Sequence, residues 1–306
     1  MDDGGSAAVV LEGVTKSYDG VIAVNHLSFE IKKGAMFGLL GPNGAGKTTT
    51  LRMLMRILVP DEGRLEILGK PLADGVQDQI GYLPEERGLY MKMEVLKVLV
   101  FLGAIKGLSE AEAKRRSEEW LGRLGLAEWA AKKVNDLSKG MQQKVQFIAA
   151  VMSRPPVLIL DEPFSGLDPM NAALIKDIML DLRREGATVI LSTHRMEQVE
   201  MMCDSICLID KGRNILSGDL KAIKRSCGKN TLRVEYEGDG SFLDCPNLIE
   251  KVTHYGAMVE AKLRPGADSQ QILRAAVERQ TRITRFELVE PPLNEIFIEE
   301  VSRAHA

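Results

Sequence analysis

The sequence predicts an α/β protein in which helices cover a parallel β-sheet, followed by a second, smaller α+β domain. Three short apolar runs have the length and character of buried parallel strands: residues 36–40, 157–160 and 188–191. Longer helical patterns separate these runs, as in residues 47–58, and this alternation is typical of a parallel sheet. Polar residues follow each run, at the sheet edge where open α/β sheets bind ligands.

The smaller domain is predicted from a change of pattern near residue 230. Strand-like stretches then recur in three segments: residues 231–236, 257–263 and 282–289. A helical pattern at residues 269–278 separates the last two segments. The turn-rich segment 227–230 is the expected boundary. Within the larger domain, residues 93–126 are rich in Leu, Lys, Glu and Ala at helical spacing, which predicts a helical insertion.

Composition excludes several classes of protein. The chain has 306 residues, of which 45% are hydrophobic and 27% charged, so it is too apolar for a disordered protein. Its length allows one large domain with an appendage. The formal net charge is -3, which supplies no basic field of the kind used to bind nucleic acid. No nucleic-acid partner is therefore expected.

The sequence favours a cytoplasmic protein with reduced cysteines. Residues 1–5 are acidic and precede no long apolar run, which argues against a secretory signal. The most apolar stretch, residues 95–105, contains a lysine and is well short of the roughly 20 residues that span a bilayer. The four cysteines form no Cys-x-x-Cys pair and are expected to be free thiols: Cys203, Cys207, Cys227 and Cys245.

A glycine-rich segment between a predicted strand and a predicted helix fits the P-loop pattern. Its glycines allow a tight turn whose N–H groups converge on phosphate oxygens at the positive end of the helix. Lys47 is expected to reach the β- and γ-phosphates of ATP, and the Thr48 hydroxyl to ligate Mg²⁺. The expected nucleotide-binding residues of this segment are Gly41, Pro42, Asn43, Gly44, Ala45, Gly46, Lys47, Thr48 and Thr49.

The apolar run at residues 157–160 ends in two carboxylates, Asp161 and Glu162. Such an end is more often structural when it occurs alone, but a P-loop in the same chain reverses that preference. Asp161 is expected to hold Mg²⁺ through water. Glu162 is placed to polarise the attacking water as a general base.

One further motif makes the pattern specific. Residues 137–142 read Leu-Ser-Lys-Gly-Met-Gln before a helical run, with Ser138 as a candidate N-cap. Over residues 9–219 the chain resembles the ABC ATPase family through the order of its motifs: the P-loop, the Leu-Ser-x-Gly signature, the Asp-Glu strand end, Ser165-Gly166-Leu167-Asp168, and His194. The resemblance implies a P-loop NTPase core with an antiparallel β subdomain. It implies an ATPase domain at 1–225, with a helical subdomain at about 86–135, and an accessory domain at 230–306.

The resemblance also implies roles for individual residues. Ser138 and Gly140 would contact ATP held by a second copy of the chain, so that two chains enclose two nucleotides. Asp168 resembles the residue that crosses this interface. His194 resembles the catalytic switch histidine at the γ-phosphate, and Tyr18 the aromatic residue that stacks on adenine.

Two positions depart from the common family pattern. Glu85 stands where the family usually has a glutamine that binds Mg²⁺ and senses the γ-phosphate. A carboxylate can still meet Mg²⁺ or its water, but it donates no hydrogen bond and adds negative charge. The signature contains Lys139 and Met141 where Gly and Gln are commonest.

Residues 82–90 and 286–297 are similar to the sodium-exporter group of ABC ATPases called NatA-like. This similarity implies the ATPase half of an ABC-2 exporter for sodium or another small substrate, held at the inner face of the membrane by a separate permease. The alternative is a soluble ABC ATPase acting on nucleic acid or ribosomes, disfavoured by the single P-loop and slightly acidic charge. A third reading, an ATP-gated scaffold without turnover, is disfavoured by Glu162.

Overall fold

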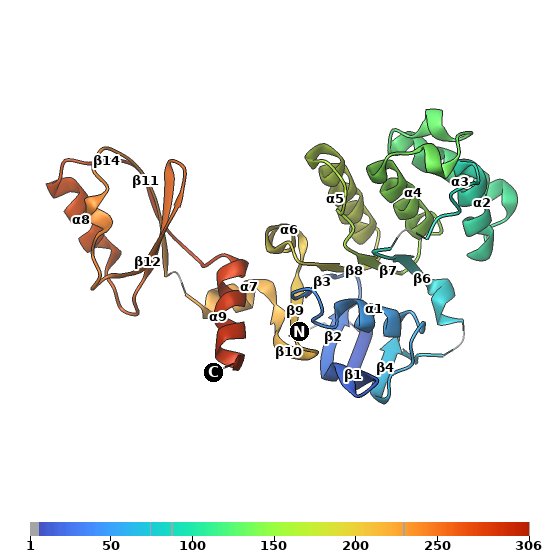
Figure 1. Cartoon of the computed structure of the whole chain (residues 1–306), viewed down its shortest axis with the longest axis horizontal. Helices are drawn as coiled ribbons and strands as arrows, with labels where there is room; N and C mark the ends of the chain where they lie inside the picture. Colours follow the sequence, from blue (N-terminus) through green and yellow to red (C-terminus); the bar gives the residue numbers. More distant parts are fainter. Residues whose placement is uncertain (1–5, 74, 87, 229, 306) are drawn as a thin grey trace. The chain divides into compact units, whose positions relative to one another are not determined.

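The computed structural model describes residues 6–73, 75–86, 88–228 and 230–305, and they form two compact units (Figure 1). The first unit is Met1–Gly218 and the second is Asp219–Ala306. The boundary precedes the segment expected from the sequence because helix α7 (Leu220–Ser226) belongs to the second unit. The expectations for residues 1–5, and for Arg87 and Lys229 within their segments, lie outside the described residues.

A six-stranded sheet forms the centre of the first unit, in the order β10-β9-β3-β8-β7-β6. The three strands predicted from apolar runs are confirmed as β3 (Met36–Leu40), β7 (Val157–Asp161) and β8 (Thr188–Thr193). They run parallel, and every residue in them is buried, which explains their continuous apolar character. The remaining strands of the sheet are β6 (Ile80–Leu83), β9 (Ser205–Asp210) and β10 (Arg213–Asp219).

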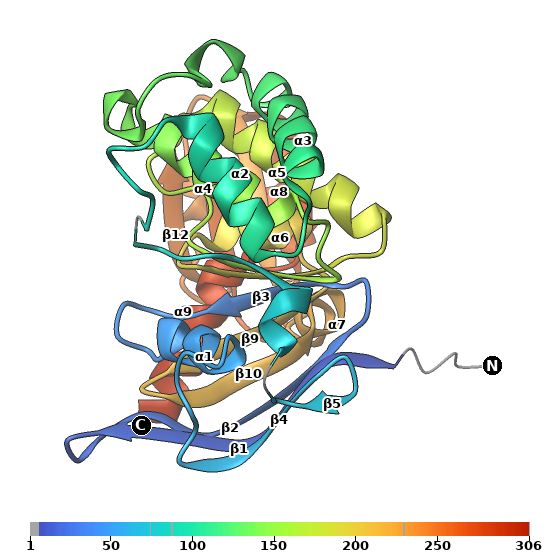
Figure 2. The same cartoon turned by 90° about the vertical axis from the view of Figure 1, so that its right-hand side faces the viewer.

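Helices connect these strands and cover the sheet (Figure 2). They are α1 (Lys47–Leu54), α4 (Lys139–Val151), α5 (Pro169–Arg184) and α6 (Met196–Met202). The predicted helix at residues 47–58 is wrong at its end, because the structure ends it at Leu54. Arg56 then adopts a left-handed conformation with a φ of 53°, and Pro60 follows, so the chain leaves the helical path.

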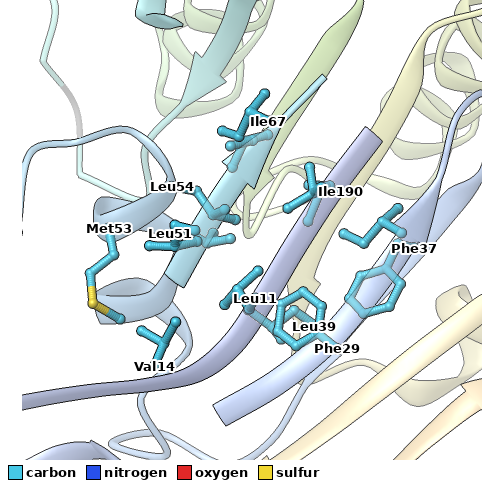
Figure 3. Close-up of a cluster of buried hydrophobic side chains, with 14 of the residues drawn as sticks. Leu11, Val14, Phe29, Phe37, Leu39, Leu51, Met53, Leu54, Ile67 and Ile190 are labelled. Carbon is cyan, nitrogen blue, oxygen red and sulfur yellow. The ribbon is translucent and has the colours of Figure 1, made fainter. Parts of the chain in front are cut away.

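A second, antiparallel sheet in the order β2-β1-β4-β5 packs against α1 and the central sheet (Figure 3). Its strands are β1 (Ala7–Tyr18), β2 (Val21–Lys32), β4 (Glu62–Ile67) and β5 (Lys70–Pro71). Asp19 and Gly20 both have positive φ angles and form the tight turn between the two long strands. The rings of Phe29 and Phe37 stack with centroids 5.1 Å apart, which joins this sheet to β3.

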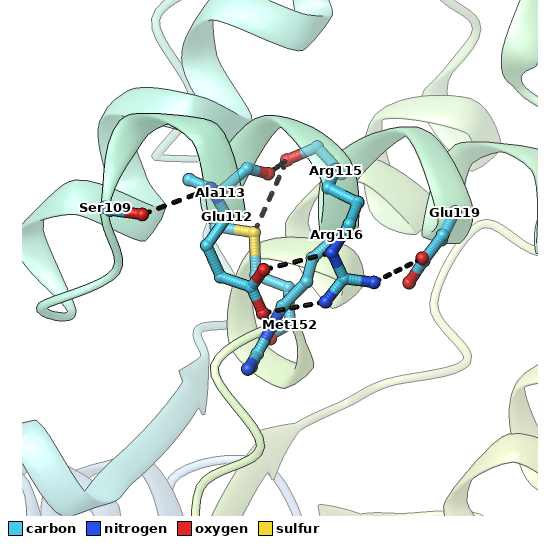
Figure 4. Close-up of polar contacts among 8 residues, drawn as sticks. Ser109, Glu112, Ala113, Arg115, Arg116, Glu119 and Met152 are labelled. Carbon is cyan, nitrogen blue, oxygen red and sulfur yellow. Dashed lines mark hydrogen bonds and ion pairs between the residues drawn. The ribbon is translucent and has the colours of Figure 1, made fainter.

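The predicted helical insertion is confirmed as α2 (Val95–Ile105) and α3 (Glu110–Arg123), with short 3₁₀ turns at Ala127–Trp129 and Val134–Asp136. The Ser109 hydroxyl caps α3 by accepting the N–H of Glu112. Along the surface of α3, Glu112 pairs with Arg115 and Arg116 at helical spacing (Figure 4). These pairs support a charged helix that presents little apolar surface.

The second unit contains a four-stranded antiparallel sheet in the order β12-β13-β11-β14. The predicted strands are confirmed as β11 (Thr231–Glu237), β13 (Met258–Leu263) and β14 (Arg282–Val289), and the predicted helix as α8 (Ser269–Glu278). In this unit the sequence analysis missed α7, β12 (Ile249–Tyr255) and α9 (Leu293–His305). Most residues of β12 are polar, so its alternation is weak.

The described helices include none that is both long and apolar enough to cross a bilayer. All four cysteines are free, and Cys203 and Cys207 are buried. Burial raises the pKa of the Cys207 thiol, which keeps it protonated.

Gly81 provides a test of packing between β6 and α4. A Cβ atom at this position would lie 2.2 Å from the carbonyl oxygen of Ala150, a backbone atom that cannot turn away. We expect Gly81→Ala to destabilise the protein by about 1–3 kcal/mol and to lower the thermal midpoint by about 5 °C. The matched control is Gly88→Ala, where a Cβ atom meets nothing within 4 Å. Equal midpoints for the two variants, measured by calorimetry, would contradict this expectation.

Candidate functional site

A cavity of about 360 Å³ lies at the carboxyl ends of β3 and β7. The structure brings to it the predicted residues of three separate segments: the P-loop, the strand end after β7, and Glu85 after β6. Its walls are formed by Ala23, Asn43, Gly44, Gly46, Lys47, Thr48, Thr49, Glu85, Asp161 and Glu162. The side chains include one ammonium and three carboxylates, so the cavity is strongly polar.

The P-loop backbone passes very close to backbone atoms of other segments of the protein. Glycine is therefore required at two positions. Gly41 has a φ of 151°, and a Cβ atom there would lie 2.2 Å from the carbonyl oxygen of Ile209. Gly46 has a φ of 105°, and its Cβ atom would lie 2.5 Å from the carbonyl oxygen of Ala23. The loop can therefore curl tightly before α1 begins at Lys47. Tight loops of this kind can direct backbone N–H groups at an anion at the start of a helix.

Lys47 is the cation of the site. Its side chain is only 7% exposed, and its ammonium donates to the carbonyl oxygens of Gly41 at 2.8 Å and Pro42 at 3.1 Å. Burial lowers its pKa, while the nearby charges of Glu162, Asp161 and Glu85 act in the opposite direction. The ammonium is thus held within the loop that would cradle phosphate groups.

Asp161 joins the P-loop helix to the neighbouring strand. Its carboxylate accepts the hydroxyl of Thr48 at 3.0 Å and the hydroxyl of Ser192 at 2.7 Å. Burial raises the pKa of Asp161, and these two hydrogen bonds lower it in part. The sequence analysis did not single out Ser192. Ser192 could have been found from its place at the polar end of a buried strand, because the same placement identified Asp161.

Glu162 is held in an unusual backbone conformation with its carboxylate fixed by three donors. Its φ is 48°, in the left-handed region, and its N–H donates to the carbonyl oxygen of Ser192 at 2.9 Å. The carboxylate accepts the Thr193 hydroxyl at 3.2 Å and the His194 N–H at 3.1 Å, and it lies 2.7 Å from His194 Nδ1. Strained backbone of this kind is typical of functional sites. Thr193 was also missed by the sequence analysis.

The donor set fits Mg²⁺ bound together with a nucleotide. Thr48 and Asp161 present a hydroxyl and a carboxylate 3.0 Å apart beside the phosphate-binding loop, and hard oxygen atoms are the ligands that Mg²⁺ prefers. Across the residues that the structure describes, no group of three or more His, Cys, Asp or Glu side chains could hold a metal ion by itself. Mg²⁺ commonly takes one or two carboxylates and completes its shell with phosphate oxygens and water.

Eight predicted site residues are not among those that line this cavity: Tyr18, Gly41, Pro42, Ala45, Ser138, Gly140, Asp168 and His194. Ser138 caps α4 by accepting the N–H of Met141 at 3.3 Å, and Asp168 caps α5 by accepting the N–H of Asn171 at 2.9 Å. Hydrogen bonds from Asn171 lower the pKa of the Asp168 carboxyl. A Cβ atom at Gly140 would lie 3.0 Å from the carbonyl oxygen of Gly166, so the signature and the Ser165–Asp168 loop are neighbours. Tyr18, at the end of β1, is 41% exposed.

Ser192 offers a test of how tightly Asp161 is held. We expect Ser192→Ala to destabilise the protein by about 1–3 kcal/mol, because it leaves a buried carboxylate oxygen without a donor. The control is Ser205→Ala at the start of β9, whose hydroxyl makes no hydrogen bond to the described part of the chain. Urea unfolding compares the two variants with the parent protein. A loss that is the same in both variants would show that the Ser192–Asp161 bond contributes nothing.

Two segments match known families. Residues 24–165 match the ABC transporter family, and residues 218–301 match the C-terminal domain of DrrA1-3-like ATP-binding proteins. The chain is 42% identical over 297 residues to the uncharacterized ABC transporter ATP-binding protein YhaQ of Bacillus subtilis (strain 168). The aligned region covers 97% of this chain and 99% of that protein. The C-terminal match is to the DrrA type, whereas the sequence analysis expected the NatA-like group.

One further relative and one solved structure add detail. The Nod factor export ATP-binding protein I of Mesorhizobium japonicum is 38% identical over 225 residues, covering 72% of this chain and 66% of that protein. The fold is similar to the dimeric structure of a post-hydrolysis state of the ATP-binding cassette MJ0796 bound to ADP and Pi. That similarity has a TM-score of 0.65 and 26% identity, and covers 69% of this chain and 98% of the other.

Proposed function

The chain belongs to the ABC transporter ATP-binding family, and on this premise we propose that it is the ATP-hydrolysing subunit of an ABC-type exporter. One observation carries the proposal. Lys47, Thr48, Asp161 and Glu162 line a single polar cavity at the end of the parallel sheet, although 113 residues separate Thr48 from Asp161. This arrangement supplies a cation for phosphates, oxygen ligands for Mg²⁺ and a carboxylate base.

Each residue has a distinct part in the proposed reaction. Lys47 and the P-loop N–H groups bind the β- and γ-phosphates of ATP, while Thr48, Asp161 and Glu85 supply oxygen atoms for Mg²⁺ and its water. Mg²⁺, when bound, neutralises charge on the phosphate oxygens. Glu162 accepts a proton from the attacking water, and its hydrogen bonds to the Thr193–His194 segment hold the carboxylate in place.

We further propose that two copies of the chain enclose two ATP molecules. Ser138 and Gly140 lie outside the cavity of their own chain, beside the loop that ends at Asp168. Residues with this placement are free to complete the site of a second copy. The similarity to a dimeric ATP-binding cassette supports the same arrangement. Tyr18 would stack on adenine, beyond the phosphate cavity.

The partner we propose is an integral membrane permease, which would hold this chain at the cytoplasmic face of the cell membrane. Support comes from a relative named for Nod factor export and from a relative named as an ABC transporter ATP-binding protein. Sodium or another small substrate is the proposed cargo, from the similarity of residues 82–90 and 286–297 to the NatA-like group.

The test is ATP hydrolysis by the purified chain, with and without Mg²⁺, alone and with a candidate membrane permease reconstituted in liposomes. We expect turnover that EDTA abolishes and that the permease changes. If the permease does not change turnover but RNA or ribosomes increase it, the result would favour a soluble ATPase over an exporter subunit. Absence of any Mg²⁺-dependent turnover would overturn the proposed function.

A further inference from the structure

Gln146 is a buried polar residue on α4 that the reaction above does not use. Its side chain is 5% exposed, and its amide Nε2 donates to the backbone carbonyl oxygen of Glu86 at 3.2 Å. Glu86 directly follows Glu85, whose side chain lines the cavity. A single hydrogen bond therefore connects α4 to the backbone of a site segment 60 residues away in the sequence.

A second glutamine on the same face of α4 makes a parallel connection. Gln143 precedes Gln146 by three residues, so the two side chains are neighbours on one side of the helix. The Gln143 Nε2 donates to the carbonyl oxygen of Pro163 at 3.4 Å, and Pro163 directly follows Glu162. Both segments that carry site carboxylates are thus tied to α4 through their backbones.

The amide oxygen of Gln146, Oε1, bears on why a polar side chain occupies this buried position. This oxygen is buried and has no hydrogen-bond partner among the described residues, which do not include Arg87. A buried polar atom without a partner costs free energy, and an apolar side chain of similar size would avoid that cost. The amide is therefore not explained by stability alone. Its one hydrogen bond goes to the segment that carries Glu85.

We propose that Gln146 is a positioning residue that keeps Glu85 in place relative to the signature helix α4. This inference rests on the proposed function. Ser138 caps the start of α4, eight residues before Gln146, and a helix spans roughly 12 Å over that distance. In the proposed dimer the start of α4 contacts ATP held by the second copy. The Gln146–Glu86 hydrogen bond then links that contact to the Mg²⁺ side of the chain's own site.

A double-mutant cycle tests this link on the full-length chain. We expect Gln146→Met to lower kcat about tenfold, because a misplaced group near the reacting atoms is costly, and to raise the Mg²⁺ concentration for half-maximal turnover. KM for ATP should stay within about twofold, because the P-loop is unchanged. If Gln146 acts through Glu85, then Gln146→Met should change kcat less than about twofold in a Glu85→Ala background. Additive effects of the two substitutions would overturn the proposal.

The matched control is Lys106→Met. Lys106 follows α2, and its ammonium donates to the carbonyl oxygens of Gln77 at 2.7 Å and Ile80 at 3.0 Å. It therefore connects the helical insertion to the opposite end of β6 from Glu85. We expect this variant to keep the parental Mg²⁺ dependence. A Mg²⁺ shift as large as that of Gln146→Met would show a general effect of loosening the insertion, and would refute the specific link.

Hydrogen–deuterium exchange gives a readout that needs no turnover. We expect the peptide covering residues 82–86, which excludes the Lys106 contact at Ile80, to exchange faster in Gln146→Met than in the parent or in Lys106→Met. Unchanged exchange would contradict the proposal. Gln146→Asn keeps the amide but shortens its reach, so it replaces Gln146→Met in every arm if that variant fails to fold. A parent protein without Mg²⁺-dependent turnover would overturn the proposed function itself, whereas an active parent with additive variants would overturn only the role of Gln146.

Discussion

Glu162→Gln is expected to lower ATP turnover by about 10³-fold while ATP binding is retained, because general-base catalysis typically contributes about 10²–10⁴-fold. The amide has nearly the same shape as the carboxylate but cannot take a proton from water. The backbone at this position, with a φ of 48°, and the N–H bond to Ser192 remain available to glutamine. The loss should therefore appear in kcat, with KM for ATP changed little.

The same variant reports on assembly. With hydrolysis blocked, ATP should hold two copies together, and light scattering in ATP and Mg²⁺ should give twice the mass of the chain. The matched control is Glu197→Gln, an exposed glutamate on α6 three residues beyond His194, which should keep parental turnover. Unchanged turnover in Glu162→Gln would exclude Glu162 as the base. A variant that stays monomeric at high concentration would contradict the shared site.

Lys47→Met is expected to weaken ATP binding by about 10–100-fold, because contacts to a charged group contribute about 1.5–3 kcal/mol. Methionine has a similar length but carries no charge to attract the phosphates. Turnover at cellular ATP concentrations should fall at least as much. Isothermal titration calorimetry with ATP in the presence of EDTA measures binding without hydrolysis.

Stability distinguishes loss of function from loss of folding in this variant. The Lys47 ammonium is buried, and burial lowers its pKa, so removing the charge also removes a desolvation cost. The substitution also removes two hydrogen bonds to the carbonyl oxygens of Gly41 and Pro42, so we expect the thermal midpoint of Lys47→Met to stay within about 5 °C of the parent. Lys33→Met, at an exposed position before β3, is the control for ATP affinity. A large fall in the midpoint of Lys47→Met would assign a structural role to the lysine.

Local patterns in the sequence predicted the central strands of the parallel sheet, the helical insertion and three strands of the second unit, but not the antiparallel strands β1, β2, β4 and β5. Continuous apolar runs predicted β3, β7 and β8 because strands buried on both faces need no polar residues. The end of α1 was mispredicted, since residues 55–58 remain apolar while Arg56 turns the backbone out of the helix. In the second unit, β12 was missed because polar residues dominate it, and polar strands carry a weak signal.

The sequence alone predicts which residues carry the chemistry, whereas the way those residues are held in place depends on the tertiary structure. The P-loop and the Asp161–Glu162 pair are contiguous motifs, so they can be identified from the sequence without knowledge of the fold. The contacts of Ser192 and Thr193 depend on the register of β7 with β8, which sets Asp161 beside Ser192 across 31 residues of sequence. The contact of Gln146 with Glu86 depends on the packing of α4 against β6. Long-range register and packing follow from the burial of the whole core, and no local pattern encodes them.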